Sequence, residues 1–370
     1  FPLTGRRVWM PTLLPLWRAT RTTGKQCGLT ATGDYQPSLR SPWLAASAAD
    51  DCPNCSATEG AQLTKGVLID MAHRFFVWGS FNRVEYGGAP LIQFNDKHAS
   101  GEVQFPYPLS SDVALIEKLC GVGFFHYGPR LWMLGEIEPL LQLQKSSTRT
   151  KVVGRILDEY PSVYLEPGGH FYRVRKAPVK PNSHAEYDSP PAGVAGNGRL
   201  DAQDFSVLYA SPDIEVCVHE CRFTAEDELY VATLNATRPL RLLNLTALPE
   251  EDGTEFESLD ISLNMLFLAG KYSYDIAREI AMAARSVGFD GLIYPSYFSE
   301  LRTGVMPLRT TYGISNRRIL QYQQMEQSLS VPNYAIFGHP VEEGLIAVQC
   351  INKMVISRVE YGFHFGPVGI

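Results

Sequence analysis

Four short segments in the C-terminal half of the sequence combine arginine, tyrosine, glutamate and serine. They are HFYRVR at 170–175, GRLD at 198–201, VLYASP at 207–212, which leads on to Glu220, and GFDGLIYPS at 288–296. The guanidinium of arginine matches pairs of phosphate oxygens. A fixed carboxylate stabilises positive charge that builds up on a carbon as a bond breaks. If the fold brings these residue types into one cleft, they could bind a phosphorylated ligand and stabilise a cationic transition state.

Local sequence signals indicate how the first three segments are held. HFYRVR has the character of a strand and ends just before a Pro- and Gly-rich stretch, 178–198, which we expect to be a long loop. GRLD closes that loop. VLYASP reads as a strand that turns into a helix over Pro212–Cys221, with Ser211 as the N-cap and Pro212 as the first helical residue. The helix would carry Glu220 near its end.

The fourth segment follows a second expected helix, Tyr274–Val287, with Ser273 as N-cap and Gly288 just beyond its end. Other parts of the C-terminal half favour short strands. We expect these at 207–209, 229–234, 240–245, 291–294, 334–337, 344–349 and 354–361. Strands that do not alternate regularly with helices predict an α+β fold with an antiparallel sheet.

The N-terminal part of the chain has a different character. Residues 1–60 are rich in Thr, Ser, Pro and Gly, and we expect an irregular leader there. Residues 61–165 predict a mixed, mainly helical domain, with helices near 63–76 and 111–120, the latter capped by Ser110 or Ser111. The 370-residue length agrees with more than one domain.

The ordered set of segments resembles the RES domain family, which is named for its Arg, Glu and Ser. In that family a strand with an arginine precedes a Pro-rich loop and a GR turn. A vLYxA/S strand then leads to a helix with the glutamate, and a G-x-D-G-l-x-Y-P-S segment supplies the serine. The matching residues here are Arg173, Arg199, Tyr209, Glu220 and Ser296. Asn333–Phe337 (NYAIF) also resembles the family's N-l-x-l-F strand, so the resemblance covers roughly residues 168–363.

The resemblance implies a fold like that of ADP-ribosyltransferases, with two small packed sheets around a cleft for NAD⁺. Residues 166–370 would be the RES catalytic domain. It implies that NAD⁺ is the substrate, and that Glu220, Arg173 and Ser296 act in catalysis. Arg173, Arg199, Tyr209 and Ser296 would bind NAD⁺: the arginines its diphosphate, the tyrosine its nicotinamide ring, the serine its ribose or amide.

The activity expected from the resemblance is that of an NAD⁺-consuming toxin or effector, a glycohydrolase or phosphorylase that cleaves the nicotinamide–ribose bond. Two alternatives stay open: mono-ADP-ribosylation of a protein, and a module that binds NAD⁺ or ADP-ribose without turnover. A cognate antitoxin or immunity protein and a homodimer are the protein partners that the resemblance suggests. Water, phosphate and a protein side chain are all candidates for the group that attacks the ribose.

The sequence departs from the family pattern after Gly198-Arg199. Leu200 stands where an aromatic residue is usual, and Asp201 where Asn is usual. Glu215 competes with Glu220 for the catalytic role, but a carboxylate close to a helix start also suits the helix dipole. The spacing from Tyr209 favours Glu220.

Histidines and cysteines near these segments have simpler interpretations. His219 points to a different face of the helix from Glu220, so we expect a structural role. Cys217 and Cys221, four residues apart, are expected to be buried small apolar residues. Cys52-Pro53-Asn54-Cys55 is a single CxxC, and a structural zinc site needs four ligands. Cys27, His73, Cys120 and His126 have no matching spacing, so we expect no metal site.

Bulk properties narrow the class of protein. The net charge is −6, which argues against nucleic acid as the main partner. Seven cysteines, an odd number in a long chain, argue against a disulfide scaffold and for the cytoplasm. No apolar run reaches the ~18 residues that a membrane span needs. No GxGxxG follows an early strand, so a Rossmann dehydrogenase is not expected.

Overall fold

The computed structural model of the protein describes most of the chain beyond residue 60. The described residues are 30–31, 47–48, 61–63, 65–84, 87–95, 103–106, 109–126, 137–191, 198–269, 271–303, 305, 309–311, 314–359 and 366. Apart from four residues, the expected irregular leader, with Cys27, Cys52 and Cys55, therefore lies outside them.

The described chain divides into two compact units. Unit 1 comprises Phe1–Phe81, Pro90–Tyr127 and Phe363–Ile370, and unit 2 comprises Asn82–Ala89 and Gly128–Gly362. All five predicted site residues belong to unit 2. Residues 137–165, which we expected in the N-terminal region, also contribute two helices and a strand to it. The expected domain boundaries near 60 and 165 stay a prediction.

Unit 1 contains an aromatic core between two helices and a two-stranded sheet. Its elements are α2 (Lys65–Ala72, continued as a π-type turn His73–Val77), α3 (Leu109–Cys120), β6 (Ile92–Asn95), β7 (Gly123–His126), and the short strands β1 (Thr30–Ala31), β2 (Ser47–Ala48) and β3 (Ala61–Leu63). Val113, Ile116 and Cys120 of α3 are buried at helical spacing. The helix starts before Ser110, so the predicted serine cap is wrong, while the helix itself is confirmed.

The larger sheet of unit 2 has five strands in the order β10-β16-β13-β12-β8. The strands are β8 (Ser162–Leu165), β10 (Val207–Ala210), β12 (Leu240–Asn244), β13 (Gly291–Pro295) and β16 (Pro332–Phe337). All neighbours pair antiparallel except β12 and β13, which are parallel. The expectation of a purely antiparallel sheet is wrong at this pair, because the two helices between β12 and β13 make a crossover connection.

The smaller sheet has three antiparallel strands in the order β17-β11-β9. These are β9 (Phe171–Lys176), β11 (Leu229–Ala236) and β17 (Ile346–Met354). The strand expected at 344–349 is part of β17, which continues to Met354 and has an irregularity in its pairing with β11 opposite Thr233 and Leu234. The strand expected at 354–361 is wrong over 355–359, which form no strand, and 360–361 lie outside the described residues. Apolar side chains of both sheets, such as Leu234, Leu242 and Ile336, share one buried cluster, so the two sheets pack together.

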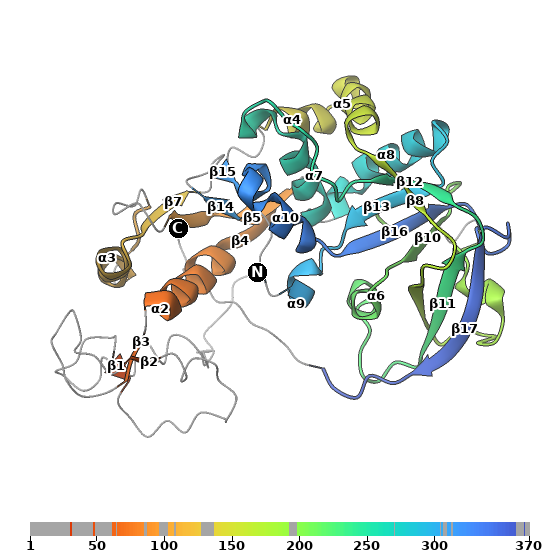
Figure 1. Ribbon diagram of the computed structural model, residues 1–370, viewed down its shortest axis with the longest axis horizontal. Coiled ribbons are helices and arrows are strands. Elements are labelled where there is room, and N and C mark those ends of the chain that lie inside the picture. The colour runs from red at the N-terminus through yellow and green to blue at the C-terminus, as the bar shows by residue number, and fades with distance from the viewer. Residues whose placement is uncertain are drawn as a thin grey trace, which may run out of the picture. The chain divides into compact units, whose positions relative to one another are not determined.

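Helices cover the other face of the five-stranded sheet (Figure 1). The helices of unit 2 are α4 (Glu138–Gln144), α5 (Ser146–Glu159), α6 (Ile214–Cys221), α7 (Leu259–Leu268), α8 (Tyr274–Ser286), α9 (Ser299–Thr303) and α10 (Leu320–Ser328). Buried residues of α5, α7 and α8 pack on Leu243, Leu292 and Phe337 of the sheet. Ile276, Ile280 and Ala284 of α8 are all buried, as their spacing predicts.

The two helices that border the site differ slightly from expectation. Helix α6 starts at Ile214, and its N-cap is Asp213, whose carboxylate accepts hydrogen bonds from the amides of Glu215 and Val216. Ser211 instead donates to the carbonyl of Pro332, so the predicted cap was two residues early. Helix α8 follows Ser273 as predicted, and Gly288 beyond its end has φ +87°, a conformation that favours glycine.

Two packed sheets flanked by helices confirm the α+β fold class. No helix among the described residues has both the length and the apolar character to cross a lipid bilayer.

Candidate active site

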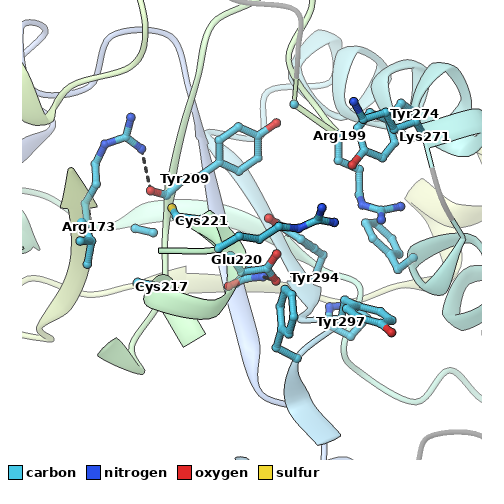
Figure 2. A pocket seen from close by; sticks show the side chains of 18 of the residues that line it. Arg173, Arg199, Tyr209, Cys217, Glu220, Cys221, Lys271, Tyr274, Tyr294 and Tyr297 are labelled. Carbon is cyan, nitrogen blue, oxygen red and sulfur yellow. Dashed lines mark hydrogen bonds between the residues drawn. The ribbon is translucent and has the colours of Figure 1, made fainter. Parts of the chain in front are cut away.

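A cavity of about 520 Å³ opens in unit 2 between the two sheets' edges and the α7–α8 connection. Pockets for small molecules are usually of this size. Its walls come from β9, the loop end at Gly198, β10, α6, the α7–α8 connection, the end of β13 and the start of β16 (Figure 2). The four predicted segments therefore meet in one place, as the sequence analysis required.

The charges around this cavity are strongly unequal. Five basic side chains line it: Arg173, Arg175, Arg199, Arg222 and Lys271. Glu220 is the single carboxylate among the described residues of the lining. In a chain with a net charge of −6, such a concentration of positive charge selects an anionic ligand. The lone carboxylate marks the point where positive charge on that ligand would be stabilised.

Glu220 is held by two donors from distant parts of the chain. The Ser296 hydroxyl donates to Oε1 of Glu220 at 2.7 Å, and the Asn333 side-chain amide donates to the same oxygen at 2.6 Å. Ser296 lies just after β13 and Asn333 lies on β16; both are at least nine-tenths buried. Because both bonds go to one oxygen, the other oxygen, Oε2, is left for a ligand.

Arg173 is buried and tied to the main chain. Its two terminal nitrogens donate to the carbonyls of Tyr209, at 2.7 Å, and Asp188, at 3.0 Å. Its Nε is buried and has no hydrogen-bond partner. Burial, and then the charge of neighbouring Arg175, lower the pKa of Arg173 to about 9, so it stays charged at neutral pH. Arg175 also donates to the Asp188 carbonyl, so both arginines bind the same point within the 178–198 stretch.

Tyr209 closes the GRLD turn. Its hydroxyl donates to Oδ1 of Asp201 at 2.7 Å and accepts the amides of Leu200, at 2.8 Å, and Asp201, at 3.1 Å. A Cβ at Gly198 would collide with the Asp201 carboxylate and the Tyr209 hydroxyl, so only glycine fits there. Burial, followed by the Asp201 charge, holds the pKa of Tyr209 well above its usual value. Tyr209 thus remains a neutral donor that shapes one wall of the cavity.

The two departures from the family pattern both have a structural role in this turn. Leu200 is fully buried in the core beneath the five-stranded sheet. Asp201, also buried, supplies the acceptor for Tyr209. The turn is therefore built with different residues but remains closed.

Arg199 anchors the end of helix α7. It donates to the carbonyls of Leu266 and Ala269, both at 3.1 Å, and to the Ser273 hydroxyl at 3.2 Å. A cation at a helix C-terminus stabilises the helix dipole. The guanidinium also lies over the ring of Tyr274, with 4.9 Å to its centroid. Arg199 therefore connects the GRLD turn to the α7–α8 wall.

Aromatic rings line the cavity beside these charges. Tyr294 of β13 stacks on Phe267 of α7, with ring centroids 5.3 Å apart, and both border the cavity. Tyr274, Tyr297 and Phe298 also line it. His219 is stacked on Phe298 at 5.7 Å, which agrees with its expected structural role. A wall of flat rings next to cations suits a ligand that has both aromatic rings and phosphate groups.

Comparison with known families agrees with this geometry. Residues 170–307 match the family described as RES domain, a range that contains all five predicted site residues. The matched range covers a little over a third of the chain. The match ends before β16, so Asn333 lies outside it.

Other comparisons are weaker. A crystal structure of the M. tuberculosis MbcT–MbcA toxin–antitoxin complex aligns over 55% of this chain and 91% of that chain, with 13% sequence identity and a TM-score of 0.33. At that TM-score the likeness carries no argument for this protein. A search among curated proteins found no match.

The two cysteines of helix α6 differ from each other in exposure. Cys217 is buried, donates to the Tyr172 carbonyl, and has its pKa raised to about 12 by burial. Cys221 is exposed and lines the cavity, so its predicted burial is wrong: it is in the last turn of α6, on the side that faces the opening.

One group of possible metal ligands occurs in the described part of the chain. Asp188, His339 and Glu342 have ligand atoms within 4.8 Å of one another. The Asp188 carboxylate already accepts hydrogen bonds from the amides of Ser189, Val341 and Glu342. These bonds hold the turn at 341–342 against Asp188. The predicted absence of metal stays a prediction, since Cys52 and Cys55 lie outside the described residues.

Among the five predicted residues, Arg173, Arg199, Tyr209 and Glu220 line the cavity, while Ser296 lies behind Glu220. Four further lining residues carry charge or orient it and were not predicted: Arg175, Arg222, Lys271 and Asn333. Asn333 starts a motif that the analysis had noted without assigning a role. No sequence signal marked Lys271 or Arg222.

Proposed function

We propose that this RES domain binds NAD⁺ and breaks the bond between nicotinamide and ribose. The observation that carries the proposal is the single carboxylate, Glu220, held by Ser296 and Asn333 in a cavity lined by five basic side chains. NAD⁺ has the matching charges: an anionic diphosphate, and a ribose carbon that becomes cationic as nicotinamide leaves.

In the proposed step the bond between ribose C1″ and the nicotinamide nitrogen breaks, and its electron pair leaves with the nicotinamide, which becomes neutral. Positive charge then spreads over C1″ and the ring oxygen. The free Oε2 of Glu220 stabilises that charge and accepts a hydrogen bond from a ribose hydroxyl. A nucleophile attacks C1″ and completes the reaction.

The nucleophile is water in a glycohydrolase, inorganic phosphate in a phosphorylase, and a side chain in an ADP-ribosyltransferase. Incubation with NAD⁺ should release nicotinamide in all three cases. Chromatography then identifies free ADP-ribose, ADP-ribose 1″-phosphate or ADP-ribosylated protein. Binding of NAD⁺ without nicotinamide release would leave only the binding-module alternative, and no binding would contradict the proposal altogether.

A role as a toxin or effector follows from the family resemblance. It predicts that expression in cells lowers their NAD⁺ content and arrests growth, whereas the Glu220→Gln variant does neither. The antitoxin or immunity protein, the homodimer and the cytoplasmic location remain parts of this proposal.

A further inference from the structure

We propose that Lys271 is the residue that binds a phosphate group of the ligand, and that it makes the cavity specific for nucleotides over nucleosides. The inference rests on the proposed function, because it concerns the same cavity. It replaces the simpler expectation that Arg173 and Arg199 are the main phosphate ligands.

Three of the five basic side chains already serve the protein itself. Arg173 and Arg175 both donate to the Asp188 carbonyl, and Arg173 also to that of Tyr209. Arg199 donates to the end of helix α7. These donors cannot turn to a phosphate without giving up bonds to buried carbonyls. They contribute positive potential to the cavity, but few of their N–H groups are available to a ligand.

Lys271 is not held by bonds of this kind. It is exposed, lines the cavity, and makes no hydrogen bond or ion pair with any residue that the structure describes. A lysine ammonium on a flexible stem is a mobile point charge with three donors, and so it can follow a phosphate. An unpaired cation that faces a cavity contributes most to the binding free energy of an anion, because no bond within the protein is lost when the anion binds.

The position of Lys271 favours it over Arg222, the second cation without a described partner. Arg222 follows Glu220 by two residues and ends helix α6 with φ 53°, so an anion there would lie near the Glu220 carboxylate. Lys271 lies just before helix α8, on the wall that also holds Arg199 and Tyr274 (Figure 2). The N-terminus of α8 adds to the positive potential on that wall. A diphosphate held there is separated from the carboxylate that the reacting ribose needs.

The proposal is tested by calorimetric titration of the full chain with ADP-ribose, ADP and adenosine. Wild type should bind ADP-ribose and ADP, with affinity that falls as salt is raised, and should bind adenosine at least about tenfold more weakly. Lys271→Ala should weaken ADP and ADP-ribose binding about 10- to 100-fold, as for loss of a bond between charged groups. Its adenosine affinity should stay at the wild-type value, and its melting temperature should not change.

Two matched variants make the outcome decisive. Lys151→Ala removes an exposed lysine on α5, away from the cavity, and should bind as wild type does. Arg222→Asn removes the competing cation with a residue that tolerates the left-handed backbone. Unchanged ADP affinity in Lys271→Ala, or a loss confined to Arg222→Asn, would overturn the assignment to Lys271. If wild type binds none of the three ligands, the proposed function itself fails.

Discussion

Asn333 and Ser296 give Glu220 its orientation, because both donate to the same carboxylate oxygen. Buried donors fixed in this way keep the second oxygen directed at the ligand without reorganisation during the reaction. The arrangement makes Asn333 a positioning residue: it acts on the reaction through Glu220. Its removal should therefore affect turnover more than binding.

We expect Asn333→Ala to lower kcat for nicotinamide release about 10- to 100-fold while KM for NAD⁺ stays within about threefold of wild type. Asn333→Asp should be at least as impaired, since it places a second carboxylate against Glu220. Asn333→Ser keeps a hydroxyl donor and should recover part of the rate. Steady-state kinetics on the three variants, with melting temperatures as a check of folding, test this. An Asn333→Ala enzyme with wild-type kcat would show that Ser296 suffices.

Arg173 should contribute to stability as well as to ligand binding, because its buried guanidinium joins two carbonyls from separate segments. We expect Arg173→Ala to lower the free energy of unfolding by about 2–4 kcal/mol, and Arg173→Lys to recover little of it, since lysine cannot make both bonds. Urea denaturation measures the effect. A wild-type unfolding midpoint for Arg173→Ala would contradict this role.

The GRLD turn illustrates what the sequence could and could not predict among the elements. The order of strands and helices around the site followed from caps, glycines and apolar spacing, as in α8 and β10. The hydrogen bond between Tyr209 and Asp201 did not, because it depends on how the chain folds back after the loop. The bond from Asn333 to Glu220, between residues 113 positions apart, is likewise a product of tertiary packing.

Errors in the predicted elements come from contacts between residues that are distant in the sequence. Asp213, not Ser211, caps helix α6, since the Ser211 hydroxyl is used by β16. Strand β17 continues to Met354, beyond the strand expected at 344–349, because its partner β11 pairs with it as far as Leu229. In both cases a contact between distant segments decided between alternatives that the local sequence left open.

The short helix at Glu255–Glu257 should make stability depend on pH. Glu255 accepts the Ser315 amide with Oε1, while Oε2 is buried without a partner. Burial raises the pKa of Glu255 to about 7 from its usual 4.5. The unfolded chain gives up this proton near pH 4.5 and the folded protein only near pH 7, so stability falls as pH rises through that interval.

Glu255→Gln removes this titration. The melting temperature of the variant relative to wild type should therefore rise between pH 4.5 and pH 7 and level off above. Differential scanning calorimetry at several pH values measures the difference. A difference that is the same at pH 5 and pH 8 would show that Glu255 titrates normally in the folded protein.

The charge around the cavity is opposite in sign to the net charge of the whole chain. The chain has a net charge of −6, yet five basic side chains and one carboxylate line the described part of the cavity in unit 2. The net charge of the chain therefore could not reveal this local concentration of positive charge. The central claim is that Glu220 is the group that stabilises positive charge on the substrate in that cavity.

The most direct test is the rate of nicotinamide release from NAD⁺ by wild type and Glu220→Gln. The glutamine oxygen can still accept the bonds from Ser296 and Asn333, so the fold and most NAD⁺ affinity should be kept. The lost charge should lower the rate ~100–1000-fold. Glu215→Gln is the control, because Glu215 is exposed on the same helix and pairs with Arg302, and it should stay near wild-type activity. A Glu220→Gln enzyme that releases nicotinamide at the wild-type rate would contradict the account.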